Sequence, residues 1–234
     1  MNQTLLKQCV AEFVGTFALI FIGVGVIANH ADLTSNAGLL AVALAHGFTI
    51  AVMVSATGAI SGGHLNPAVT FGVLVGGKIG LQRSVAYWVA QIAGAVLAAA
   101  LVGLLLRSGD VSGKDLVFKG TPALGKGATG LQSVGIEAVL TFFLVFVVYG
   151  SAVDSRAPKI GGLAIGLTVA LDILFGGPFT GAAMNPARTF GPALVSGQWD
   201  HHYVYWVGPL LGGALAGLIY GRFLIKPDVD SSSK

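Results

Sequence analysis

Long apolar stretches, separated by short polar segments, make up most of this sequence. Six of them are about as long as the roughly 20 residues that a helix needs to cross a bilayer. They lie at about 8–28, 39–59, 85–106, 133–153, 160–176 and 203–225. The first carries Glu12 within a long apolar run, which is unlike a cleaved signal peptide. We therefore expect an all-α membrane protein with six transmembrane helices.

Two further apolar stretches, near 66–76 and 185–195, are too short to cross a bilayer. Each begins with Asn-Pro, and proline suits the first position of a helix because its missing N–H has no helical partner to lose there. Non-helical backbone at membrane depth must be buried in protein or line a watery cavity. We therefore expect two half-helices inside re-entrant loops.

The two halves of the chain resemble each other. AEFVGTFALIF at 11–21 aligns with IEAVLTFFLVF at 136–146, and ISGGHLNPAVTFG at 60–72 aligns with FTGAAMNPARTFG at 179–191. Each half holds three spans, and an odd number of crossings makes the second half enter the bilayer from the opposite side. Inverted repeats of this kind place their interrupted segments, and their site, near the midplane of the bilayer.

These boundaries predict a single domain over 1–234. Its first repeat covers about 8–106, an outer linking loop covers 107–131, and the second repeat covers about 133–225. The two half-helices should then point their N-terminal ends at each other across a narrow path.

Basic residues between the spans indicate the orientation, because cytoplasmic loops carry an excess of Lys and Arg. With both termini inside, eight basic residues lie on the inner side and four on the outer side. The inner set is Lys7, Lys78, Arg83, Arg156, Lys159, Arg222, Lys226 and Lys234, and the outer set is Arg107, Lys114, Lys119 and Lys126. We expect an integral multi-pass protein of the cell membrane with cytoplasmic termini.

Composition narrows the class of function. The chain is 54% hydrophobic and only 10% charged, whereas a soluble domain carries about 25% charged residues. Its net charge of +3 comes from scattered basic residues, so no nucleic-acid partner is indicated. One cysteine, Cys9, excludes an intrachain disulfide and a cysteine-based zinc site. With no Walker-type loop and no metal-ligand spacing, we expect no enzyme, no cofactor and no metal.

The two half-helices predict a selective path for a neutral solute. A helix N-terminus carries about half a positive elementary charge, so two that face each other repel cations and hydrated protons. The amides of Asn66 and Asn185 can donate to a passing oxygen. Backbone carbonyls before each motif would supply acceptors that lead to this centre. They belong to Gly62, Gly63, His64, Leu65, Gly181, Ala183 and Met184.

Two motifs, Asn66-Pro67-Ala68 and Asn185-Pro186-Ala187-Arg188, stand within SGGHLNPAVTFG and GAAMNPARTFGPA. With these motifs and the AEFVGT run near the N-terminus, the chain resembles the aquaporin, or major intrinsic protein, family across nearly its whole length. The resemblance implies a passive water channel that excludes ions and protons. It also implies a right-handed bundle of six tilted helices, one pore per subunit and a homotetramer in the lipid bilayer.

The same resemblance places the outer constriction of the family on His46, Ile173, Ala182 and Arg188. The usual bacterial water channel has Phe at the first of these positions and His at the second. This set is more similar to that of plant vacuolar aquaporins, some of which also pass ammonia or hydrogen peroxide. Glycerol-passing relatives typically have Asp after the arginine, and here that residue is Thr189. A glycerol facilitator is therefore the alternative within the family.

Three acidic residues lie within the predicted spans, where a charge is costly and counts as a functional hypothesis. Glu12 and Glu137 occupy equivalent positions of the two repeats, so we expect them to accept hydrogen bonds from the N–H groups of the re-entrant loops. In the alternative from another class, a proton-coupled secondary transporter, they would bind protons. Asp172 could face the outer mouth, contact a polar neighbour or be protonated, and the sequence does not decide among these.

Overall fold

The computed structural model describes residues 3–29, 36–106, 111–158 and 160–225. Six of the helices in these ranges are long and apolar enough to cross a membrane, as the sequence predicts. They contain α1 (Gln3–Asn29), α2 (Asn36–Ser61), α4 (Leu81–Leu105), α6 (Gly130–Val148), α7 (Gly161–Thr180) and α9 (Val204–Ala216). The spans that contain α6 and α9 run on to Val153 and Leu224. Two π-helical turns, η1 (Tyr149–Val153) and η2 (Gly217–Leu224), continue α6 and α9. Four residues of the orientation argument, Arg107, Lys159, Lys226 and Lys234, lie outside the described ranges.

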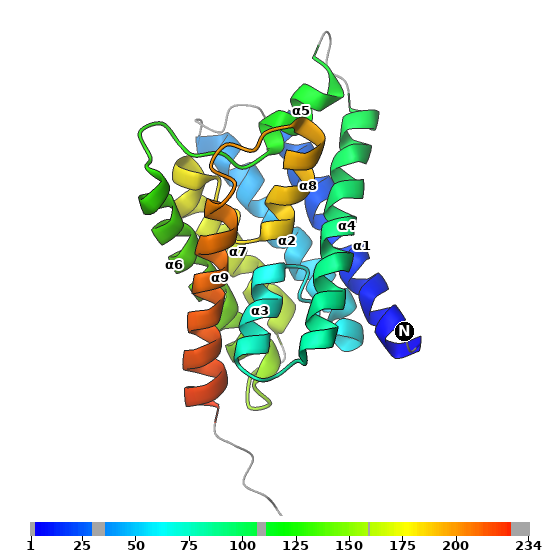
Figure 1. The fold of residues 1–234 in the computed structure, drawn as a ribbon, viewed down its shortest axis with the longest axis vertical. Helices are drawn as coiled ribbons and strands as arrows, with labels where there is room; N and C mark the ends of the chain where they lie inside the picture. Colours follow the sequence, from blue (N-terminus) through cyan, green and yellow to red (C-terminus); the bar gives the residue numbers. More distant parts are fainter. Residues whose placement is uncertain (1–2, 30–35, 107–110, 159, 226–234) are drawn as a thin grey trace, which may run out of the picture.

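Both predicted half-helices are present, as α3 (Pro67–Val75) and α8 (Pro186–Ser196). Each begins with proline after an asparagine whose side-chain oxygen caps the first turn: Asn66 Oδ1 accepts from the Ala68 N–H at 2.8 Å, and Asn185 Oδ1 accepts from the Ala187 N–H at 3.0 Å. Figure 1 shows α3 in one half of the bundle and α8 in the other, between the long helices. The sequence therefore gives both half-helices N-terminal ends with fixed caps.

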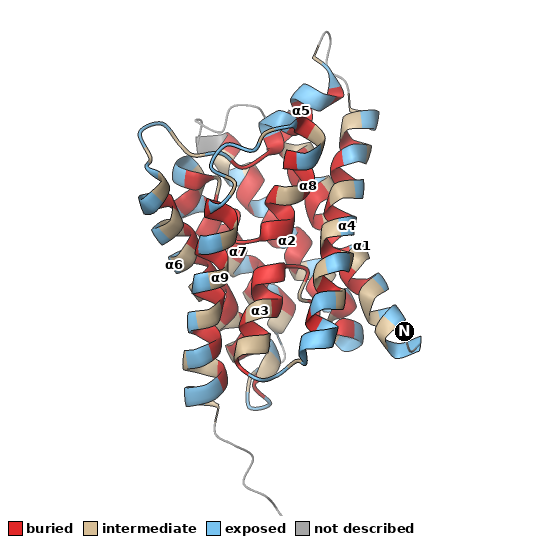
Figure 2. Cartoon of the chain, in the orientation of Figure 1, coloured by how far each residue is buried: buried red, intermediate tan, exposed pale blue. Residues whose placement is uncertain are grey.

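The six long helices pack closely through glycine. A Cβ added to Gly47 of α2 would lie 2.6 Å from the carbonyl oxygen of Gly166 in α7, so these two backbones are in direct contact. Large apolar side chains instead cover the outer surface, where Leu104, Leu171 and Phe223 are all more than half exposed. Figure 2 shows this pattern as a buried interior with pale, exposed outer faces. The first described residues and the end of η2 lie at the same end of the bundle (Figure 1).

The fifth span ends later than predicted. The fifth span continues four residues beyond 176, to Thr180, and holds Pro178 inside the helix. A Gly-Gly-Pro sequence usually signals a break, but here the helix ends only at Gly181, which has a left-handed backbone with φ 76°. This extension carries Thr180 to the re-entrant loop.

The outer segment 107–131 is not wholly a loop, which corrects the prediction. It contains the helix α5 (Gly113–Gly120) in its described part. Ser112 caps this helix, because its Oγ accepts from the Asp115 N–H at 3.2 Å. The sequence carries this signal as Ser-x-x-Asp, a pattern typical of a helix start, but the apolar content of the segment is too low for a span.

Candidate pore

Both re-entrant loops have the same unusual backbone. In each loop the first, second and fourth residues of the four that precede the motif asparagine have positive φ values. The values are 94° at Gly62, 64° at Gly63, 54° at Leu65, 76° at Gly181, 43° at Ala182 and 51° at Met184. A non-glycine residue in this left-handed region costs about 1–2 kcal/mol. Such backbone persists only where the surrounding contacts hold it.

Glu12 holds the first loop. Its Oε1 accepts hydrogen bonds from Ser61 Oγ at 2.6 Å and from the His64 N–H at 2.9 Å. Its Oε2 accepts from the Leu65 N–H at 2.6 Å and from Gln91 Nε2 at 2.8 Å. The carboxylate is fully buried. One acidic side chain thus satisfies two backbone donors that lipid could not satisfy.

Glu137 has the same position in the second loop. Its Oε1 accepts from Thr180 Oγ1 at 2.7 Å and from the Ala183 N–H at 2.9 Å. Its Oε2 accepts from the Met184 N–H at 2.7 Å. The position equivalent to Gln91 holds proline, Pro209, and the described residues offer this carboxylate three donors. In both halves a glutamate therefore accepts hydrogen bonds from the re-entrant loop, but the number of bonds differs.

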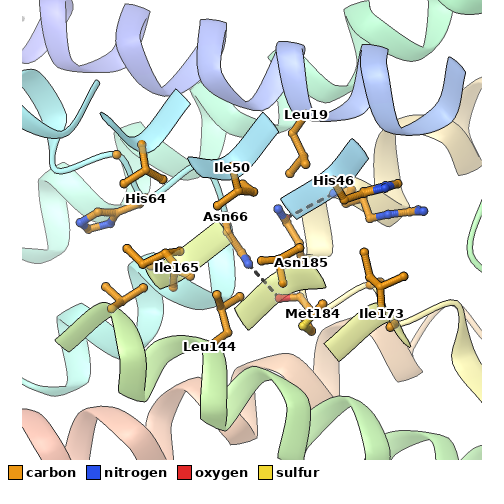
Figure 3. A pocket seen from close by; sticks show the side chains of 18 residues that line it. Leu19, His46, Ile50, His64, Asn66, Leu144, Ile165, Ile173, Met184 and Asn185 are labelled. Carbon is orange, nitrogen blue, oxygen red and sulfur yellow. Dashed lines mark hydrogen bonds between the residues drawn. The ribbon is translucent and has the colours of Figure 1, made fainter. Parts of the chain in front are cut away.

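The two motif asparagines connect the halves. Asn66 Nδ2 donates to the Met184 carbonyl at 2.8 Å, and Asn185 Nδ2 donates to the Leu65 carbonyl at 3.0 Å. Figure 3 shows the first of these bonds beside the cavity. A side-chain amide has two N–H hydrogens, so each asparagine keeps one that no residue of the described chain uses. The carbonyls of Leu65 and Met184, which we predicted as acceptors along the path, accept these cross-bonds.

A narrow cavity of about 30 Å³ lies where the loops meet (Figure 3). One water needs roughly 10–15 Å³ measured in this way, so the cavity has room for about two or three. Five residues with polar side chains border it, and these are His46, His64, Asn66, Asn185 and Arg188. Four further loop residues, Gly63, Ala182, Ala183 and Met184, also border it. The remaining wall is apolar, and of it the sequence predicted Ile173 but not Leu19, Ile50, Val54, Val69, Leu144, Val148, Ile165 and Val169.

Some predicted positions do not border this cavity. Gly62 and Leu65 are absent from its wall, and Gly181 instead borders a wider space next to the cavity. The prolines and alanines of both motifs are buried in the first turns of the half-helices, where they fix the ends of α3 and α8. The structure thus brings the two asparagines together and places the rest of each motif behind them.

The four residues of the predicted constriction border the same cavity. His46 is 2% exposed, and its Nδ1 lies 2.8 Å from the Val42 carbonyl. A carbonyl can only accept, so Nδ1 carries the hydrogen of the neutral ring. Arg188 is 4% exposed, and its Nη1 donates to the Gly120 carbonyl at a long 3.4 Å. Its Nε has no partner in the described chain, so the guanidinium keeps free donors.

Comparison with known proteins now decides the family. A family model described as Major intrinsic protein matches residues 1–220. The chain belongs to the major intrinsic protein family. Among curated relatives, "Probable aquaporin TIP3-2" of Arabidopsis thaliana is 45% identical, over 96% of this chain and 86% of the relative. "Aquaporin TIP2-1" of Zea mays is 46% identical, over 96% of this chain and 90% of the relative.

The fold is also that of a solved family member. The X-ray structure of the aquaglyceroporin from Plasmodium falciparum matches with a TM-score of 0.79 and 25% sequence identity. The match covers 94% of this chain and 97% of the other. The predicted all-α fold of six spans and two half-helices in inverted repeats is therefore confirmed.

In the protein described here, a wider vestibule of about 580 Å³ lies on one side of the constriction. Lys119, Lys126 and Arg188 border it, and none of the described residues of its wall is acidic. A cavity bordered by charges of one sign concentrates their field. The approach to the constriction is therefore unfavourable for cations.

Asp172 borders neither the cavity nor the vestibule. It is 6% exposed, and its Oδ2 has no hydrogen-bond partner within the described chain. The sequence left three possibilities open for Asp172. It does not border the vestibule, and no described residue is a hydrogen-bond partner of its Oδ2. Burial without a partner disfavours an ionised carboxyl group.

Proposed function

We propose that this chain is a passive transmembrane water channel that excludes ions and protons and also passes small neutral solutes such as ammonia or hydrogen peroxide. The observation that carries this proposal is the meeting of two half-helix N-termini at a cavity of about 30 Å³. Asn66 and Asn185 each keep a free N–H there. The relatives that carry the name aquaporin support the same function.

In this mechanism, neutral amide and carbonyl groups of the protein replace the hydrogen bonds that a water molecule gives up on entering the cavity. A water at the centre accepts from an asparagine N–H, and its own hydrogens turn away from the two positive helix ends. Gly63, His64 and Ala183 border the cavity. In this proposal their backbone carbonyls accept from waters on either side of the centre. A cation or hydrated proton meets the same helix ends, Arg188 and the basic vestibule, and is repelled.

The constriction sets the range of solutes. Ile173 and Ala182 present only apolar side chains, so His46 and Arg188 are its polar side chains. Ammonia and hydrogen peroxide are close to water in size and need few bonds. Glycerol is less supported, since the curated relatives reported above are named aquaporins and the aquaglyceroporin match is only 25% identical. A proton-coupled transporter is disfavoured, because no carboxylate of the described chain borders the cavity.

We further propose that residues 1–234 form one channel domain with the predicted repeat boundaries, and that four such subunits form a homotetramer. Both termini are cytoplasmic in this proposal, since the basic residues favour that orientation. The relatives do not support the predicted placement in the cell membrane, because they are plant aquaporins of the TIP type. The multi-pass membrane location is independent of that question.

The test measures shrinkage of proteoliposomes under an osmotic gradient by stopped-flow light scattering, with parallel uptake of ammonia and glycerol. We expect shrinkage far faster than in empty liposomes, with a low activation energy. Shrinkage at the rate of empty liposomes, or uptake that saturates and depends on a proton gradient, would contradict a water channel.

The variant Arg188→Ala tests the constriction. Its side chain makes one long hydrogen bond, so we expect the variant to fold while it passes larger solutes and more protons. Arg83→Ala is the matched control, because this substitution also removes one positive charge. Arg83 borders a surface cleft and not the pore. Equal selectivity of both variants would remove Arg188 from the constriction.

A further inference from the structure

Gly23 of α1 faces the imidazole ring of His46. It does not border the cavity itself. A Cβ added to Gly23 would overlap His46 Nε2, and it would lie 2.8 Å from Cε1 and 2.9 Å from Cδ2 of the same ring. Carbon atoms in favourable contact are about 3.5–4.0 Å apart, so the ring would have to move by about 1 Å.

The ring has little other room. It is 2% exposed, and its Nδ1 donates to the Val42 carbonyl one turn earlier in α2. Protein interiors are close-packed, so a displaced side chain moves toward the nearest void. For His46 that void is the cavity that it borders together with Arg188. A side chain at position 23 would therefore drive the ring into the constriction or break its bond to Val42.

The environment of Gly23 differs from that of glycines that bring two backbones together. A Cβ at Gly94 or Gly212 would meet the backbone of a neighbouring helix. At Gly23 the three nearest atoms all belong to the side chain of His46. The missing Cβ thus makes room for this ring specifically. Gly25, two residues further along α1, has no atom within 4 Å of an added Cβ and offers a matched control.

We infer that Gly23 is a positioning residue for the width of the constriction: because it lacks a side chain, the His46 ring can lie in the wall and not in the opening. This inference rests on the proposed channel function and extends it. The cavity has room for only about two or three waters. A ring that an added methyl group pushes into it would therefore exclude part of this water. The space beside Gly23 thus holds the His46 ring in the wall, and the opening stays wide enough for water, ammonia and solutes of that size.

The first test compares Gly23→Ala, Gly25→Ala, His46→Ala and the double variant Gly23→Ala/His46→Ala in proteoliposomes. Water permeability is expressed per folded channel. We expect Gly23→Ala to lose about fivefold or more, equivalent to about 1 kcal/mol in the barrier, while Gly25→Ala keeps the permeability of the unsubstituted protein. Without the imidazole the added methyl group has room, so Gly23→Ala should then have almost no further effect.

Two results would overturn the inference in a conducting protein. One is full permeability of Gly23→Ala, and the other is an equal loss in the presence and absence of His46, which indicates a structural role of Gly23 in α1. A second readout does not depend on conduction: the ¹⁵N resonances of the His46 ring should shift in Gly23→Ala and stay in place in Gly25→Ala. Unchanged resonances would refute the inference that Gly23 sets the position of the His46 ring. Absence of water flux in the unsubstituted protein would refute only the proposed function.

Discussion

At the scale of single residues, Glu12 and Glu137 differ in the number of donors that each carboxylate accepts. Glu12 accepts four hydrogen bonds, two on each oxygen. Glu137 accepts three, and its Oε2 receives only the Met184 N–H. A glutamine has one acceptor oxygen, and its amide nitrogen would face donors at the other position. The two repeats should therefore respond unequally to the same substitution.

We predict that Glu12→Gln destabilises the protein by about 2–4 kcal/mol and Glu137→Gln by about 1–3 kcal/mol, because each buried donor that loses its acceptor costs about 1–3 kcal/mol. Thermal unfolding in detergent measures the order. The water permeability of the channels that remain folded should stay close to normal. Unchanged stability with loss of a proton-dependent flux would instead favour a transporter, in which these groups bind protons.

The sequence alone predicted the residues that act through their position in the repeat. Glu12, Glu137 and the two motif asparagines stand out because polar groups are rare in apolar spans. It did not predict Leu19, Leu144 or Ile165 as part of the cavity wall. An apolar side chain that faces a pore has the same chemical character as one that faces lipid. Only the packing of the helices distinguishes the two.

At the scale of elements, the loop after η1 attaches the C-terminal turn η2. Arg156 Nε donates to Asp154 Oδ1 at 2.9 Å, and its Nη2 donates to the Leu224 carbonyl at 3.4 Å. The hydrogen bonds from Arg156 are the largest cause that lowers the pKa of Asp154 from 3.8 to about 2. Because the pKa is lower in the folded state, ionised Asp154 stabilises this contact at pH values above its ordinary pKa. This stabilisation is lost as the pH falls toward 2.

We therefore predict that η2 stays attached equally well at pH 8 and pH 5 and loosens only between about pH 4 and pH 2. Hydrogen exchange of the amides of η2, corrected for the intrinsic effect of pH, measures the attachment. Arg156→Gln should lower protection at neutral pH, and Asp154→Asn should remove the change at low pH. A loss of protection between pH 8 and pH 5 would show that another group controls this turn.

Elements were predictable where length and hydropathy suffice. The spans follow from the bilayer thickness, and the half-helices follow from Asn-Pro before a short apolar run. The helix α5 was missed although Ser112 and Asp115 form its cap, because a helix of eight residues has no hydropathy signal of its own. The end of α7 was placed too early for the opposite reason: Pro178 is a strong local signal that tertiary packing overrides.

At the scale of the whole molecule, the two inverted halves meet through two hydrogen bonds at the centre. Asn66 reaches the Met184 carbonyl of the second half, and Asn185 reaches the Leu65 carbonyl of the first. Each carbonyl immediately precedes the asparagine that makes the other bond. The two bonds therefore form one contact, and either one positions the partners of the other.

This arrangement predicts that Asn66→Ala and Asn185→Ala are not independent. Each variant removes a helix cap, worth about 1 kcal/mol, and leaves a buried carbonyl without its donor, which costs about 1–3 kcal/mol. Once one bond is lost, the contact between the halves has already loosened, so the second substitution should cost less than it does alone. We expect the double variant to fall short of the sum by about 0.5–1.5 kcal/mol in thermal unfolding. The pair Asn66→Ala with Arg156→Gln shares no partner and should be additive. Additivity of the two asparagine variants as well would mean that the two bonds between the halves act independently of each other.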